Sequence, residues 1–143
     1  MLYSSMTGRT ERMAERMITY MKEESIEVKV KTFVENDIDV QQLLAYDMIF
    51  VGVYTWADGE LPLEAEDLFD EIHTLDFTGK VCGVFGSADS SYEDYGTAVE
   101  IMYEELEDAG ATMVPDSIIV DLEPDEAELK QCEKMVATAI DMT

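Results

Sequence analysis

The chain has 143 residues, enough for one domain with a sizeable core and too few for two. Apolar residues make up 47% of it, which excludes a disordered acidic tail, and no apolar run approaches the ~20 residues of a membrane span. With 33 acidic residues against 9 basic ones, the net charge is −24, and this makes nucleic acid a poor partner, because such a surface repels phosphate backbones.

The excess of negative charge has two interpretations. It can be solubilising, as in halophiles. It can also steer the protein to basic faces on other proteins, in which case salt should slow their encounter. The chain does not open with the charged, apolar and small residues of a signal peptide, so we expect a soluble cytoplasmic protein.

Short apolar runs that suit buried strands recur along the chain, and the run Met48–Val53 is the clearest of them. The first run, Met1–Tyr3, is shorter than the ~5 residues of an average strand. We therefore expect a weak first strand, or a sequence that starts a few residues late. The five expected strands are Met1–Tyr3, Ile26–Val34, Met48–Val53, Val81–Phe85 and Ser117–Val120.

Segments with a helical period lie between these runs. One apolar stripe carries Met13, Met17 and Met21, and similar stripes cover residues 99–106 and 129–140. The methionines are expected to fill the core, as are Cys82 and Cys132, which show no metal-ligand or redox spacing. His73 is expected at the solvated end of a helix. The repeated alternation of strand and helix predicts a single domain, 1–143, with a parallel sheet covered by helices on both sides.

Three loops follow strands at the edge where such sheets bind ligands, Ser4–Thr10, Tyr54–Pro62 and Gly86–Gly96. The first loop places three hydroxyls and a glycine directly before a helix. This pattern favours a phosphate cradle, because backbone N–H groups and the helix dipole both attract an anion there. Ordinary helix capping by serine or threonine is the alternative.

Aromatic residues distinguish the other two loops. Trp56 lies in a turn of glycine, aspartate and proline, and Tyr92 occupies a matching position in the third loop. An aromatic side chain at the wet edge of a sheet suits stacking on a planar ring. Together the three loops predict a site for a phosphorylated, flat heteroaromatic ligand.

The motifs Ser-x-Thr-Gly-x-Thr, Thr-Trp-Ala-Asp-Gly and Gly-x-x-Asp-Ser-Ser-Tyr resemble the three FMN-binding loops of flavodoxins. They occur in the family's order, and the resemblance covers essentially the whole chain. No insertion of about twenty residues precedes Asp121, so the chain is similar to the short-chain class. The resemblance implies a three-layer α/β/α sandwich around a five-stranded parallel sheet of order 2-1-3-4-5.

The resemblance also implies roles for individual residues. Thr55 would reach the phosphate or the ribityl chain of FMN, and Trp56 and Tyr92 would stack on the inner and outer faces of the isoalloxazine ring. Arg9 occupies a variable position and would either touch the phosphate or stay in solvent. The phosphate would be held by Ser5, Met6 (through its backbone), Thr7, Gly8 and Thr10. The N5 edge would meet the Ala57, Asp58 and Gly59 turn, and the pyrimidine end would meet Ser87, Ala88 and Asp89.

Two alanines depart from the family pattern, because Ala57 and Ala88 stand where many relatives carry glycine. In flavodoxins the peptide beside N5 turns over on one-electron reduction, and the resemblance implies the same here. This turn needs a positive φ, which alanine adopts only at a cost of ~1 kcal/mol. We expect the one-electron-reduced flavin to be less stable here than in an Ala57→Gly variant, and redox titration of both proteins would test this.

The function implied is that of a low-potential one-electron carrier rather than an enzyme, because FMN performs the chemistry and no catalytic residue or metal ligand is needed. Flavodoxin reductase would be the donor and other basic-faced oxidoreductases the acceptors, with the carrier a monomer. The alternatives are a flavoprotein that activates ribonucleotide reductase, a flavin enzyme acting on quinones, and a phosphoacceptor signalling domain. The last needs acidic residues after its first strand, where Ser4 and Ser5 stand.

Overall fold

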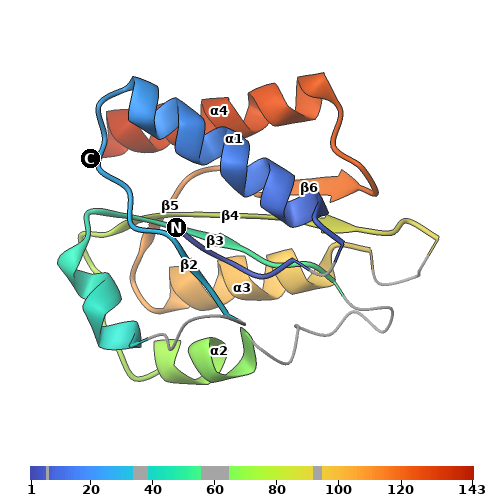
Figure 1. The fold of residues 1–143 in the computed structure, drawn as a ribbon. Helices are drawn as coiled ribbons and strands as arrows, with labels where there is room; N and C mark the ends of the chain where they lie inside the picture. The colour runs from blue at the N-terminus through green and yellow to red at the C-terminus, as the bar shows by residue number, and fades with distance from the viewer. Residues whose placement is uncertain (6, 34–38, 56–64, 92–94) are drawn as a thin grey trace.

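A parallel β-sheet forms the middle layer of the molecule, with helices on both of its faces (Figure 1). The computed structural model describes residues 1–5, 7–33, 39–55, 65–91 and 95–143. The strands run in the order β2-β1-β3-β4-β5, and β6 also pairs with β4, so the strand order implied by the sequence is confirmed. The strands are β1 (Leu2–Tyr3), β2 (Lys31–Thr32), β3 (Met48–Gly52), β4 (Val81–Ala88), β5 (Thr112–Met113) and β6 (Ile118–Asp121).

The outer position beside β4 is filled by two short strands rather than by one strand at Ser117–Val120. β5 pairs with Val81 and Cys82, and β6 pairs with the last four residues of β4. Between them the chain leaves the sheet at Pro115, which has no N–H to donate to a ladder, and at Asp116, whose φ is 61°. β4 can therefore be paired along almost its whole length, although its partner is broken.

Two other strand boundaries differ from the expectation. Among the described residues, β2 spans two residues instead of the expected Ile26–Val34, of which Val34 lies outside the description, because the strand it pairs with there is the equally short β1. β4 continues through Gly86 to Ala88, where a loop was expected, because β6 runs beside these residues. The predicted third loop therefore starts at Asp89 among the described residues.

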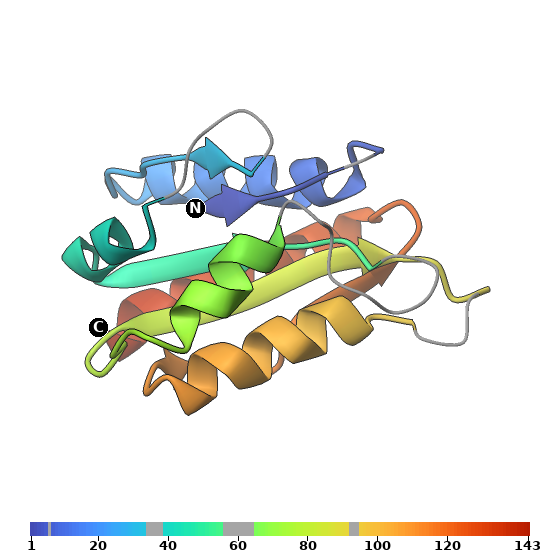
Figure 2. The same ribbon diagram turned by 90° about the horizontal axis from the view of Figure 1, so that it is seen from below.

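The helices cover both faces of the sheet (Figures 1 and 2). α1 (Arg9–Glu23) and α4 (Glu126–Met142) lie on one face, where Met13, Met17 and Met21 are almost fully buried, as expected. α2 (Glu66–Ile72) and α3 (Thr97–Asp108) lie on the other face. The connection from β2 to β3 contains a 3-10 helix, η1 (Val40–Ala45), on the same side as α2 and α3.

Cys82 lies on β4, Cys132 on α4, and His73 directly follows α2. Cys82 and Cys132 are each 0% exposed, which confirms that both belong to the core. His73 is exposed, but it is not merely solvated, because its Nδ1 lies 2.6 Å from Oε1 of the buried Glu105 on α3. This contact joins the end of α2 to α3.

Candidate cofactor-binding site

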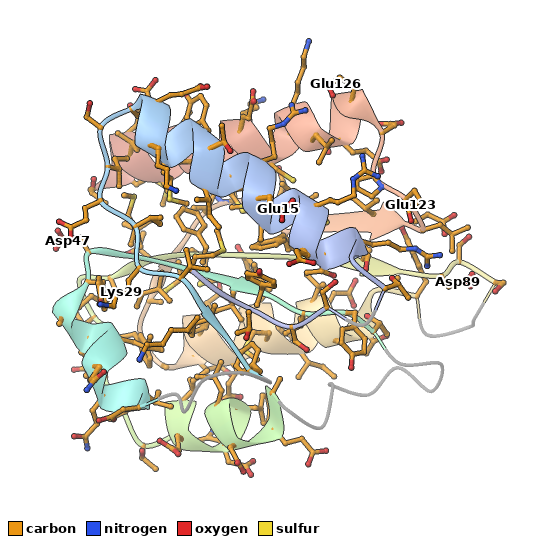
Figure 3. All side chains as sticks on the ribbon, in the orientation of Figure 1. Glu15, Lys29, Asp47, Asp89, Glu123 and Glu126 are labelled. Atoms are coloured by element: carbon orange, nitrogen blue, oxygen red, sulfur yellow. The ribbon has the colours of Figure 1, made fainter. Side chains whose placement is uncertain are left out.

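The carboxyl ends of the strands meet at one edge of the sheet, and the first described residues after them form the candidate site. Figure 3 shows Asp89 and Glu123 at this edge, and Lys29 and Asp47 at the opposite one. The edge is therefore built by the segments that follow β1, β3, β4 and β6. Parallel α/β sheets bind ligands at such an edge.

The segment between β1 and α1 is folded around the hydroxyl of Ser5. Ser5 Oγ accepts hydrogen bonds from the N–H of Gly8 (3.1 Å) and of Glu11 (3.3 Å). Gly8 has a φ of 83°, and a Cβ built on it would meet nothing within 4 Å. Gly8, the N-cap of α1, has no side chain with which to cap the helix, and Ser5 Oγ supplies an acceptor for Glu11 N from the preceding loop. This arrangement fits a phosphate, which needs converging N–H donors and room in front of them.

Thr10, the second residue of α1, is held against β4. Its side chain is 0% exposed, and its Oγ1 lies 2.9 Å from Ser87 Oγ and 3.3 Å from the Ser87 N–H, which donates to it. The sequence analysis assigned Thr10 to the phosphate and Ser87 to the pyrimidine end of the ligand, and the two side chains are hydrogen-bonded to each other directly. The contact fixes the start of α1 relative to the end of β4.

Thr55, after β3, is likewise engaged within the protein. Its Oγ1 accepts a hydrogen bond from the N–H of Ala98, in the first turn of α3, at 3.3 Å. The N-cap of α3, Gly96, has a φ of 76° and no side chain to cap the helix. Thr55 therefore caps α3 from the segment after β3 and ties that segment to the helix.

The end of β4 approaches β3 very closely. A Cβ on Gly86 would lie 1.7 Å from the carbonyl oxygen of Val53, so only glycine fits at this position. Ser87 and Ala88 follow it and are nearly buried, at 5% and 6% exposure. Asp89 is half-buried and accepts hydrogen bonds from Ser91 N (2.9 Å) and Ser91 Oγ (2.6 Å), which lower the pKa of its carboxyl group.

Two acidic residues that the sequence analysis did not assign to the site also hold it together. Asp121 accepts hydrogen bonds from Ser90, and Glu123 lies 3.3 Å from Arg9 Nε and 2.9 Å from Arg12 Nη1. Arg9 is thus paired with a carboxylate in this structure. The sequence could have indicated Asp121 as a site residue, because it directly follows an apolar run at the carboxyl end of an expected strand.

Six of the expected site residues lie outside the described residues. They are Met6, Trp56, Ala57, Asp58, Gly59 and Tyr92. The described residues of the site come from all three predicted loops, and they meet at one edge of the sheet.

A parallel α/β sandwich with a glycine-capped helix N-terminus and hydroxyl-rich strand ends at one edge is typical of nucleotide-type binding proteins of the doubly wound class. The family model described as Flavodoxin matches residues 1–135. The chain is 37% identical to Probable flavodoxin 2 of Bacillus subtilis over 129 residues, covering 90% of this chain and 84% of that one. It is 34% identical to the flavodoxin of Maridesulfovibrio salexigens, over 90% of this chain and 88% of that one.

A solved structure shows the same similarity in three dimensions. The crystal structure of oxidised Flavodoxin 1 from Bacillus cereus matches with a TM-score of 0.94 and 35% identity, covering 99% of this chain and 96% of that one. The chain belongs to the flavodoxin family. It is therefore an FMN-dependent electron carrier, not an enzyme, and it passes electrons to redox partners. Among the described residues, no helix is long and apolar enough to cross a membrane.

Proposed function

We propose that this protein is a low-potential one-electron carrier, one domain over residues 1–143, whose FMN lies at the edge formed by the segments after β1, β3 and β4. The observation that carries the assignment is the loop before α1, which Ser5 Oγ folds by accepting from Gly8 N and Glu11 N and which has open space beside Gly8. A helix N-terminus with a glycine N-cap and hydroxyl side chains beside it is a favourable place for a phosphate.

The described residues suggest how each part of the cofactor is held. Ser5, Thr7, Gly8 and Thr10 surround the phosphate, with Thr10 fixed by Ser87. The segment of Ser87, Ala88 and Asp89 meets the pyrimidine end. FMN supplies the redox chemistry, and the chain binds it, orients it and limits its contact with water. The roles expected of Met6, Trp56, Ala57, Asp58, Gly59 and Tyr92, and of Arg9 and Thr55, remain part of this proposal.

The acidic surface supports the low potential and the choice of partners. Reduction adds negative charge to the flavin, and a protein of net charge −24 opposes that addition. The same field attracts basic faces, so a flavodoxin reductase as donor and basic-faced oxidoreductases as acceptors fit best. A monomeric, cytoplasmic carrier is consistent with this role.

Titration of the purified protein with FMN and with riboflavin tests the assignment of the site. We expect FMN to bind below micromolar concentration and riboflavin, which lacks the phosphate, to bind far more weakly. Equal affinity for both ligands would contradict the phosphate site at the start of α1. No binding of FMN at micromolar concentration would contradict the whole proposal.

Spectroelectrochemical titration of the FMN complex tests the redox role. We expect two separated one-electron steps, the second at a strongly negative potential. A single two-electron step would contradict a one-electron carrier and favour a flavin enzyme instead.

A further inference from the structure

Asp121, the last residue of β6, contacts the segment after β4 with both its backbone and its side chain. Its Oδ1 accepts a hydrogen bond from Ser90 N at 3.0 Å, and its Oδ2 accepts one from Ser90 Oγ at 2.6 Å. In the sheet, Asp121 is paired with Ala88. Asp89 therefore lies between Ala88 and Ser90, both of which Asp121 contacts.

This support comes from one side of β4 only among the described residues. On the other side, Thr55 N, in the segment after β3, donates to the Ser87 carbonyl at 3.3 Å, one residue before Ala88. Beyond Ser87, the contacts to another strand come from Asp121 and from Leu122, whose N–H donates to the Ala88 carbonyl at 2.8 Å. The position of residues 88–90 thus depends on the end of β6.

The backbone after Asp121 is held in an unfavourable conformation. Leu122 has a φ of 58°, in the left-handed region that a residue with a branched side chain adopts at an energetic cost. This turn brings Leu122 N to Ala88 and continues to Glu123, which pairs with Arg9 and Arg12 at the start of α1. The same short segment, residues 121–123, therefore contacts both the pyrimidine-end segment and the helix behind the phosphate.

We propose that Asp121 is a positioning residue for the cofactor: its carboxylate holds Ser90 so that residues 87–89 meet the pyrimidine end of FMN. This inference rests on the proposed function. Asp121 acts through Ser90, and it contributes by hydrogen-bond geometry rather than by charge. Its charge alone would oppose binding, because FMN carries a phosphate dianion.

Charge and geometry can be separated by three variants. Asp121→Ala removes both hydrogen bonds and the charge. Asp121→Asn removes the charge but keeps an acceptor for Ser90 N and a polar group for Ser90 Oγ. Glu100→Gln, at an exposed position in the first turn of α3, removes one charge at the same edge of the sheet, and the Glu100 side chain makes no hydrogen bond or ion pair with the described residues.

Each variant and the unmodified protein are titrated with FMN and with riboflavin, and urea unfolding of each apoprotein is measured in parallel. We expect Asp121→Ala to weaken both ligands about tenfold, because two hydrogen bonds to a charged group are lost at the ring end. Asp121→Asn should stay within about threefold of the unmodified protein. Glu100→Gln should bind FMN equally well or slightly more tightly.

The visible circular dichroism of the bound flavin gives a second signal, because it reports the surroundings of the ring. We expect it to change in Asp121→Ala and to persist in Asp121→Asn. Equal affinities and spectra for Asp121→Ala and Glu100→Gln would overturn the inference while the proposed function stands. So would a loss with FMN alone, since the effect would then lie at the phosphate. Failure of the unmodified protein to bind either flavin would overturn the proposed function itself and this inference with it.

Discussion

Among single residues, Thr10 is the one whose hydroxyl most directly fixes the geometry of the site. It is buried and pairs with both Oγ and N–H of Ser87. Thr10→Val keeps the shape of the side chain and leaves the Ser87 groups without this partner, so we expect unfolding to become easier by about 1–3 kcal/mol. Urea unfolding of the apoprotein measures this.

A serine at the same position is the matched control for this contact. Thr10→Ser keeps the hydroxyl and loses one buried methyl group, with an expected effect of about 1 kcal/mol. FMN affinity should fall in Thr10→Val and be largely retained in Thr10→Ser. If the valine variant were as stable as the unmodified protein, the Thr10–Ser87 contact would not support the site.

Burial also determines the chemistry of the two thiols. It raises the pKa values of Cys82 and Cys132 from 9.0 to about 12. Because the folded pKa lies above the unfolded one, the thiols' contribution to stability is complete below about pH 9 and is lost as the pH rises towards 12. We expect no reaction with a disulfide reagent at pH 8 until the protein unfolds, whereupon both thiols react. Rapid reaction of the folded protein would contradict their burial.

At the scale of elements, the ends of α1 and α3 use the same backbone motif with different residues. After α1, Ser25 N donates to the Lys22 carbonyl and Ile26 N to the Met21 carbonyl. After α3, Gly110 and Ala111 make the equivalent hydrogen bonds. This Schellman motif requires a positive φ, which is 59° at Ser25 and 99° at Gly110.

The chain therefore offers a reciprocal pair of substitutions. Ser25→Gly should stabilise the protein by about 1 kcal/mol, because glycine adopts this conformation freely. Gly110→Ser should destabilise it by more than that, since its Cβ would also lie 2.9 Å from Thr78 Oγ1. Thermal unfolding measures both changes, and FMN affinity should be unaffected in Ser25→Gly. A loss of stability in that variant would show that its serine compensates for the strain.

The arrangement of elements was largely predictable, whereas the contacts that build the site were not. Apolar runs and stripes identified the buried strands and the methionine face of α1, because burial needs only local periodicity. The hydroxyl contacts join residues 77 positions apart for Thr10–Ser87 and 43 apart for Thr55–Ala98, so they depend on register that no local pattern carries. The break between β5 and β6 could have been anticipated from Pro115.

At the scale of the whole molecule, net charge is expected to dominate the response to salt. Arg9, Arg12 and Arg16 of α1 pair with Glu123, Glu126 and Glu133, and salt weakens these exposed pairs, which contribute little to stability. Salt also screens the repulsion among 33 acidic residues opposed by 9 basic ones. Because repulsion is the larger effect, the apoprotein should become more stable as the sodium chloride concentration rises. A gain of about 1 kcal/mol in the free energy of unfolding would raise Tm by about 4 °C, which calorimetry of the apoprotein measures.

The same screening should act in the opposite direction on electron transfer to a basic partner. The second-order rate of electron transfer from the reduced FMN complex to cytochrome c, used as a basic probe protein, should fall steeply over the same salt range. A neutral one-electron acceptor is the control and should react at a rate that hardly changes. If stability rose while the cytochrome rate stayed constant, the charge would be solubilising only, and the steering role would be wrong.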